Sequence, residues 1–191
     1  SAEQSFNIGG ETVTWHYPSR SQCKSCHTEA SGGALGWHTG QINKTHKVGN
    51  VEVNQLLAME ILQLLDTVPK NPPAYPDPAN EAAPLNDRAR AALFVNCAGC
   101  HVPGGAATTD FDLRYETALA DTKTCNVLAD KGSMGVLNAK ILAPGMPQLS
   151  TLWLRMNTLG DERMPNLGSS VIDTKTTALI EAWITQLKGC D

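Results

Sequence analysis

The chain has 191 residues, which is enough for one domain or two small ones. A formal net charge of −4 excludes the strong basic surplus of most nucleic-acid-binding proteins, and no stretch approaches the roughly 18 apolar residues of a membrane-spanning helix. Only 5% of the residues are aromatic, while eleven prolines and sixteen glycines favour ordered loops between short helices. We therefore expect something other than aromatic side chains to fill part of the core.

The N-terminal part of the chain predicts one short strand and one helix. Residues 12–18 alternate weakly between apolar and polar side chains, which favours a strand. A glycine-rich stretch at residues 31–36 is typical of a loop. Apolar residues then recur at helical spacing from Val51 to Asp66, so we expect a helix there.

A proline-rich segment separates this part from the rest of the chain. Six of the eleven prolines fall within residues 69–84, which can therefore form neither a helix nor a central strand. Such a segment is a stiff, extended connector. The domains that we expect are residues 1–83, including a connector at 69–83, and residues 84–191.

The C-terminal part predicts three helices. Asn86 is placed to cap a helix that runs into Cys97, and Ser150 is placed to cap a short helix. Asp173 is placed to cap a last helix, which Gly189 can end.

Four of the six cysteines lie in two copies of the pattern C-x-x-C-H. The first copy is Cys23-Lys24-Ser25-Cys26-His27, and the second is Cys97-Ala98-Gly99-Cys100-His101. This pattern is typical of covalent attachment of c-type haem, because two thiols one turn apart can reach the two vinyl groups of one porphyrin. The histidine that follows binds the iron. The sequence therefore predicts two covalently bound haem c groups, with His27 and His101 as iron ligands.

Two other interpretations of these cysteines have to be weighed. Each C-x-x-C pair could be a redox dithiol or half of a zinc site, and the two pairs together could form a four-cysteine zinc site. Neither interpretation explains a histidine at the same offset after both pairs, and no βαβ pattern lies near either pair. Two large buried haem groups would also account for the small number of aromatic residues.

Met164 is our candidate for the sixth ligand of the second haem. It lies 63 residues after His101, directly before Pro165, and shortly before the last predicted helix. This placement resembles that of class I cytochromes c, in which a methionine on a proline-stiffened loop before the last helix binds the iron. The thioether is a neutral, soft ligand that favours ferrous iron, so Met/His ligation raises the potential of a haem. A methionine can also simply fill a core, and we expect that role for Met156.

The sixth ligand of the first haem has four candidates, which are His46, His38, His16 and Met59. We choose His46, because it lies far enough beyond the first motif to cross to the distal face. His38 lies on a loop that resembles the one near the proximal histidine in class I cytochromes c, where a hydrogen-bonding role is as common as ligation. Met59 falls within a predicted helix, and His16 precedes the motif by only a few residues. An iron that is open or bound by water is the further alternative.

Cys125 and Cys190 have no haem-type neighbourhood. Covalent haem attachment takes place in the periplasm or outside the cell, where disulfides persist. We therefore expect a Cys125–Cys190 disulfide, with two free thiols or a bond to another chain as alternatives, in a periplasmic or secreted protein. The chain opens at Ser1 without the charged and apolar regions of a signal peptide, so we expect a mature protein or an excised domain.

The second motif, the Met164 loop and the last helix together resemble the class I cytochrome c fold. In that fold, the first and last helices cross and the haem lies in a crevice. The resemblance therefore implies that the first and last helices of this part cross, through contacts among Leu93, Phe94, Trp183 and Ile184. The fold class that we expect is mainly α, with two cytochrome c-like haem units built from short helices and long Pro/Gly-rich loops around covalent haems.

A wider set of short segments carries a more specific likeness. The segments are 17–27, 35–36, 41–43, 54–56, 95–101, 103–105, 144–145, Ser150, Leu152, Arg155, 163–165 and 183–184. They resemble a family of bacterial exported dihaem c-type cytochromes, whose members are often the C-terminal part of larger redox or carbohydrate-associated proteins. The resemblance covers nearly the whole chain and implies electron transfer without naming a substrate. One departure is Met146, where members often have an acidic residue after Pro-Gly.

The motifs and the resemblance predict a monomeric protein that transfers electrons between redox partners outside the cytoplasm. Its partner would be a redox protein or a dehydrogenase, either separate or within the same larger polypeptide. No Ser/His/Asp set, phosphate-binding loop or pair of carboxylates stands out, which disfavours an enzyme. The alternative is a dihaem peroxidase- or oxidase-like enzyme, or a gas sensor, each of which would use an open first haem.

Overall fold

The computed structural model describes residues 2–191, in which the helices and strands are short. Helices make up 29% of the residues and strands 14%, in six α-helices and two small antiparallel sheets among the described residues. The expectation of a mainly α fold made of two cytochrome c-like haem units is therefore wrong. None of the helices in this range is long and apolar enough to cross a membrane.

Two hairpins account for the strands of the described residues. Strand β1 (Ala2–Ile8) pairs with β2 (Glu11–Tyr17), and β3 (Thr45–Val48) pairs with β4 (Val51–Asn54). The strand expected at residues 12–18 is confirmed as β2. The other three strands were not predicted from the sequence, and they replace helix or loop in the expected fold.

Glycine-containing turns explain these hairpins. Gly9 and Gly10 join β1 to β2 with φ values of 63° and 92°, and Gly49 begins the turn from β3 to β4 with φ 61°. Two-residue hairpin turns need positive φ, which glycine adopts without a steric clash of a Cβ atom. Both turn signals are present in the sequence, and together with the flanking strand residues they outweigh helix formation locally.

The helix expected from Val51 to Asp66 is shorter than predicted. Its first four residues form β4, and helix α3 occupies only Gln55–Ile61. Asn54 caps α3 by accepting a hydrogen bond from the backbone N–H of Leu57 at 3.1 Å. The apolar residues before this cap pair in a strand, so their helical spacing was misleading.

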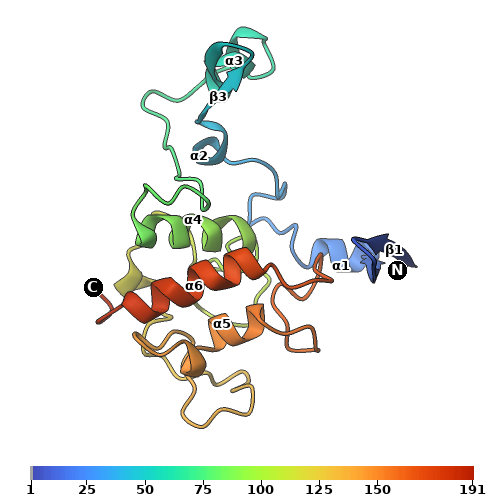
Figure 1. Ribbon diagram of the computed structural model, residues 1–191, viewed down its shortest axis with the longest axis vertical. Helices are drawn as coiled ribbons and strands as arrows, with labels where there is room; N and C mark the ends of the chain where they lie inside the picture. Colours follow the sequence, from blue (N-terminus) through green and yellow to red (C-terminus); the bar gives the residue numbers. More distant parts are fainter. Residues whose placement is uncertain (1) are drawn as a thin grey trace.

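The main core lies in residues 84–191, around α4 (Leu85–Cys97), α5 (Thr151–Met156) and α6 (Thr174–Gln186). Figure 1 shows α4 and α6 side by side, with α5 next to α6. One buried cluster joins these elements through Ala89, Leu93, Leu142, Ile180, Trp183 and Ile184. The predicted contact between the first and last helices is confirmed for Leu93, Trp183 and Ile184. Phe94 packs instead in a second cluster with Ala98, Val102, Phe111 and Leu113.

The predicted caps of the three helices have different outcomes. Asp173 caps α6 as expected, because its carboxylate accepts the backbone N–H groups of Lys175 and Thr176. Asn86 does not cap α4, which already begins at Leu85. Ser150 precedes α5, but its hydroxyl donates to a loop carbonyl rather than capping the helix.

The expected Cys125–Cys190 disulfide is confirmed. The two Cα atoms are 5.7 Å apart, and 65 residues of sequence separate the two cysteines. The bond ties the C-terminal end of the chain to the loop that follows Thr124. Because disulfides persist outside the cytoplasm, it is compatible with the expected export.

The N-terminal part does not gather around one core. Figure 1 shows the first hairpin with α1 (Arg20–Lys24) on one side, and α2 (Thr39–Ile42), the second hairpin and α3 at the top. Its buried hydrophobic residues, within the described range, are Ile42 and Leu56. The division of the chain at residue 83 stays a prediction.

The proline-rich connector has neither helix nor strand, as predicted. It folds back on the N-terminal part, because the Asn43 amide donates to the carbonyls of Pro72 and Pro73. The backbone N–H of Tyr75 donates to the carbonyl of Gly40 at 2.8 Å.

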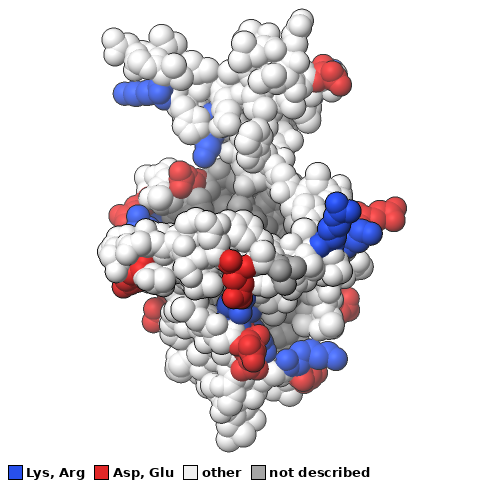
Figure 2. Space-filling model, turned by 90° about the vertical axis from the view of Figure 1, so that its right-hand side faces the viewer, with Lys and Arg blue, Asp and Glu red and all other residues white. Residues whose placement is uncertain are grey.

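On the face shown in Figure 2, acidic and basic side chains are interspersed among a mostly uncharged surface.

Candidate haem-attachment sites

The first C-x-x-C-H motif begins on α1 and continues as one helical turn. The carbonyl of Cys23 accepts the backbone N–H of Cys26 at 3.2 Å and that of His27 at 3.0 Å. Ser19 and Gln22 close a capping box at the start of α1, which fixes the direction in which the chain enters the motif. The local sequence therefore determines the turn that carries both thiols and the histidine.

The second motif has the same backbone arrangement. Cys97 is the last residue of α4, and its carbonyl accepts the backbone N–H of Cys100 at 3.1 Å and that of His101 at 2.9 Å. In both motifs, one helical turn separates the two cysteines, and the histidine follows at once. Two segments far apart in the sequence thus present the same set of groups in the same local geometry.

One ring nitrogen of His27 makes a hydrogen bond, and the other is left to bind a metal. Its Nδ1 lies 2.7 Å from the carbonyl oxygen of Gly33. A carbonyl can only accept, so Nδ1 donates the hydrogen bond and Nε2 is the nitrogen left to bind a metal. A histidine that ligates a metal almost always donates its other N–H in this way, which also orients the ring. The side chain is exposed.

His101 lies in a more enclosed place. Its Nδ1 is 3.1 Å from the Thr109 hydroxyl, and its ring stacks on Phe111 with centroids 4.2 Å apart and an interplanar angle of 10°. Burial lowers the pKa of His101 to about 4. The imidazole is therefore neutral at pH 7, which is the form that binds metals.

The thiols of the two motifs meet. Sγ of Cys100 lies 3.2 Å from Sγ of Cys26 and donates a hydrogen bond to it. Burial raises the pKa of Cys100 to about 12, with a further contribution from that hydrogen bond, and burial also raises the pKa of Cys97 to about 12. Cys97 packs against both apolar clusters of the C-terminal part. These two thiols are therefore protonated in the haem-free chain at pH 7.

Residues that follow the first motif pack against the second. A Cβ atom on Gly99 would lie 3.0 Å from a methyl carbon of Leu35, so Leu35 packs closely on this position between the two cysteines. His38 lies 4.6 Å from Phe94, measured between ring centroids. The two motifs thus share one neighbourhood, although they come from opposite sides of the connector.

These features fit two c-type haems. Each motif offers two thiols on one turn and an imidazole whose Nε2 can bind iron, which is the donor set that a covalent haem needs. Among residues 2–191, no group of three or more His, Cys, Asp and Glu side chains is arranged to hold a metal ion by itself. The fit to haem rests on the motifs and on the orientation of the histidines.

Arg155 anchors the loop that carries Met164. The carbonyl of Arg155 accepts the backbone N–H of Met164 at 2.9 Å, and its guanidinium donates to the carbonyl of Glu162 at 2.9 Å and to that of Gly132 at 3.2 Å. The half-buried Met164 therefore lies on a loop held to the end of α5. This loop leads into the start of α6, which lies near the end of α4 that carries Cys97, because the two helices run antiparallel (Figure 1).

The four candidates for the sixth ligand of the first haem lie in different places. His16 is next to α1, with its two ring nitrogens 3.4 Å from the Gln22 amide oxygen and 3.5 Å from the Glu3 carboxylate. His38 packs near the second motif. His46 is exposed on β3, and Met59 lies on α3; both elements are well apart from α1 in Figure 1. The structure does not bring His46 to the first motif, and its ligation stays a prediction.

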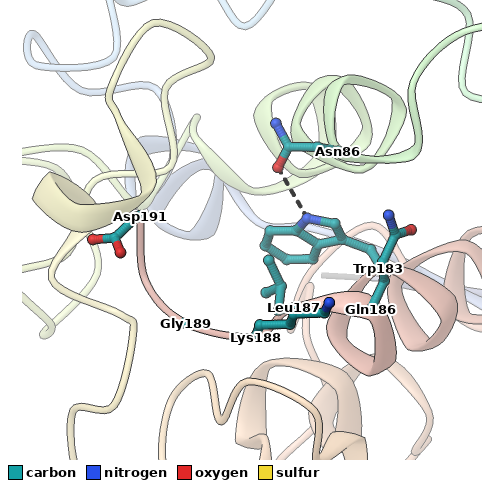
Figure 3. Close-up of a pocket in the computed structure, with 7 residues that line it drawn as sticks. All are labelled: Asn86, Trp183, Gln186, Leu187, Lys188, Gly189 and Asp191. Atoms are coloured by element: carbon teal, nitrogen blue, oxygen red, sulfur yellow. Dashed lines mark hydrogen bonds between the residues drawn. The ribbon is translucent and has the colours of Figure 1, made fainter.

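A pocket of about 320 Å³ lies where α4 begins and α6 ends, at the opposite end of α4 from the second motif. Trp183 and Asn86 line it and are hydrogen-bonded to each other, and the residues after α6 complete its wall (Figure 3). Asn86 is at the start of α4, whereas Cys97 is at its end. We therefore assign this pocket no part in binding haem.

The orienting partners of the two histidines were not predicted from the sequence. Gly33 follows the first motif by six residues and Thr109 follows the second by eight, and both lie on irregular loops. The glycine-rich stretch was a signal for a loop, but neither residue has a feature that marks it as a partner of histidine.

Comparison of the chain with protein-family models, with curated proteins and with solved structures finds no match. The function therefore has to be inferred from the two motifs and from the residues around them.

Proposed function

We propose that the chain is a dihaem c-type cytochrome that transfers electrons between redox partners outside the cytoplasm. The observation that carries the proposal is the doubled C-x-x-C-H motif, with the same backbone turn and a histidine bonded through Nδ1 in both copies. A redox dithiol or a four-cysteine zinc site would need the cysteines, but neither would need a histidine bonded through Nδ1 after each pair.

The residues that would hold the two haems follow from the motifs. Cys23 and Cys26 would form thioethers with the first porphyrin and Cys97 and Cys100 with the second, while His27 and His101 would bind the irons. Met164 would be the sixth ligand of the second iron, and His46 is the predicted sixth ligand of the first. When bound, each haem supplies one one-electron couple.

The rest of the chain would orient these ligands and tune their basicity. The Gly33 carbonyl is a stronger acceptor than the Thr109 hydroxyl, and it is also closer to its histidine. A strong acceptor at Nδ1 makes Nε2 a better donor to iron. Phe111 fixes the plane of the His101 ring, and Arg155 positions the Met164 loop.

The partner that we propose is a redox protein or a dehydrogenase in the periplasm or outside the cell, either separate or joined to this chain. The Cys125–Cys190 disulfide supports an oxidising compartment. Mixed charges on one face and a net charge of −4 suit a brief encounter, because complexes of electron-transfer proteins are small and weak.

Electron transfer is tested by reductive titration of the loaded protein under nitrogen. We expect each chain to take up two electrons and to pass both to an oxidised one-electron acceptor, such as a small copper protein. A chain that takes up two electrons but transfers none to any acceptor tried, while turning over hydrogen peroxide, would contradict the proposal.

The second candidate is a dihaem peroxidase- or oxidase-like enzyme or a gas sensor. The placement of His46 on β3, apart from α1, favours it, because the first iron would then lack this ligand. Carbon monoxide added to the ferrous protein separates the candidates. One equivalent bound per chain, and none bound by the variant Cys23→Ser/Cys26→Ser, would favour an enzyme or a sensor. No binding at all would exclude both.

A further inference from the structure

Cys26 and Cys100 form a close sulfur pair between the two motifs. Their sulfur atoms are 3.2 Å apart, and the residues are 74 positions apart in the sequence. Within residues 2–191, neither Cys23 nor Cys97 makes such a contact with another thiol. The pair therefore links the second cysteine of one motif to the second cysteine of the other.

Packing between the segments around the two cysteines holds the sulfurs together. Leu35 contacts the Gly99 position, and the Ala30 Cβ atom lies 3.7 Å from where a Cβ on Gly104 would be. His38 lies against Phe94. These contacts join residues 30–38, which follow Cys26, to residues 94–104, which include Cys100, so the meeting of the thiols is part of the fold.

We propose that Cys26 and Cys100 form a disulfide across the two motifs in the haem-free chain. A disulfide has an S–S length of about 2.05 Å and is therefore reached by closing the sulfurs by roughly 1.2 Å. Both side chains are half-buried, so a small oxidant can reach them. The exposed Cys23 and the packed Cys97 are left as thiols.

The oxidation is balanced by a small disulfide such as oxidised glutathione, in the oxidising compartment that export implies. One cysteine attacks a glutathione sulfur, breaks the glutathione disulfide and releases one glutathione thiol. The other cysteine then attacks the mixed disulfide and releases the second. The chain loses two protons and two electrons, which the glutathione disulfide takes up.

This disulfide would block both motifs at once, because each haem needs both thiols of its motif. Reduction of one bond would then make both motifs ready for haem. This consequence rests on the proposed function, whereas the disulfide itself does not.

The test uses the full chain exported by cells that lack haem-attaching enzymes. The chain is equilibrated with a glutathione buffer, treated with N-ethylmaleimide under denaturing conditions, and digested with trypsin without reduction. Cleavage after Lys24 separates Cys23 from Cys26, while Cys97 and Cys100 share the peptide 91–114. We expect most of the Cys26 peptide to be linked to this peptide, with fragmentation placing the bond on Cys100 and the maleimide on Cys97.

Three variants make the result specific. Cys26→Ser and Cys100→Ser should each abolish the linked peptide and leave the other cysteine alkylated, whereas the matched control Cys23→Ser should keep it. Disulfides within each motif, or four alkylated thiols in the oxidised chain, would overturn the proposal.

The same chain made with haem-attaching enzymes distinguishes this result from the proposed function. A linked peptide in the haem-free chain, with no haem bound in cells that have the attaching enzymes, would support the disulfide and contradict the cytochrome function. Bound haem in those cells, with no linked peptide in the haem-free chain, would support the cytochrome function and contradict the disulfide.

Discussion

The indole N–H of Trp183 donates to the side-chain oxygen of Asn86 at 3.0 Å, which joins the last helix to the first turn of α4 (Figure 3). Trp183 is only 2% exposed, so this bond gives its buried N–H a partner at the edge of the core. It also fixes α4 and α6 as antiparallel, which brings the end of α4 with Cys97 near the start of α6.

The variant Asn86→Ala should lower the free energy of unfolding by about 1 kcal/mol, the usual net worth of a hydrogen bond that water can partly replace. Asn96→Ala is the matched control, because Asn96 is on the same helix and bonds only to the carbonyl of Ala92. Urea denaturation measures both. A control that is destabilised as much as Asn86→Ala would show that helix propensity, not the bond to Trp183, sets the effect.

Local signals predicted some elements well. The cap at Asp173 and the strand at residues 12–18 each depend on side chains within a few positions. The role of Asn86 could not be predicted, since its partner Trp183 lies 97 residues away. The helix expected from Val51 begins only at Gln55, because the spacing of its first apolar residues also fits a strand and the Gly49 turn decided between the two.

In the candidate site, too, local features could be predicted from the sequence and long-range contacts could not. The turn of each motif is local and was expected from C-x-x-C-H. The contact of Cys26 with Cys100 depends on how residues 30–38 pack on the other part of the chain, so no local pattern indicates it. The sixth ligand of the first iron cannot be predicted from a local pattern either. The hairpin that carries His46 is joined to the first motif by a long irregular segment, so its position depends on long-range packing.

Removal of the Cys125–Cys190 disulfide should destabilise the chain strongly. The bond closes a loop across a separation of 65 residues, for which the chain-entropy model gives a loss of about 4 kcal/mol. The double variant Cys125→Ser/Cys190→Ser avoids a free thiol, and denaturation of the haem-free chain measures the change. Cys23→Ser should cost far less, because Cys23 is exposed. A double variant as stable as its parent would show that the bond does not constrain the unfolded chain.

Asp112 should make stability fall in acid. Hydrogen bonds from Arg114, together with one from Thr117, hold the pKa of Asp112 at about 2, below its ordinary 3.8. The unfolded chain therefore takes up a proton first, and the contribution of this carboxylate is complete above pH 4 and is lost as the pH falls toward 2. Asp112→Asn should lower the free energy of unfolding at pH 7 by about 1–3 kcal/mol and flatten this acid dependence.

The control for Asp112 is Asp110→Asn, which removes an exposed ion pair with Lys123 and should change little. Unfolding in urea at several pH values measures both variants. An acid dependence that is the same in Asp112→Asn and in the parent would assign it to other carboxylates.

The two haems of the loaded protein should differ in potential, with the first lower. With Met164 as the proposed sixth ligand, the second iron would favour the ferrous state, and axial ligands set haem potentials over a range of roughly 0.8 V. At the first iron, the Gly33 carbonyl makes His27 a stronger donor, and the exposed position of His27 stabilises the charged, oxidised form. Both effects lower the first potential.

A spectroscopic redox titration measures the two potentials. Two waves are expected, and Met164→Ala should lower only the upper one by a sizeable part of that range. Met146→Ala, which changes a partly exposed methionine of another loop, should move neither. A single wave, or a Met146 variant that shifts the upper wave, would refute the ligand assignment.

The central claim is that the two C-x-x-C-H motifs hold two haems covalently, and the intact mass of the chain tests it most directly. The chain is made with haem-attaching enzymes and extracted with acidified acetone, which removes haem that is not covalently bound. We predict a mass equal to the polypeptide plus two haems, with one haem lost in Cys23→Ser/Cys26→Ser and one in Cys97→Ser/Cys100→Ser. A mass equal to the bare polypeptide would contradict the account.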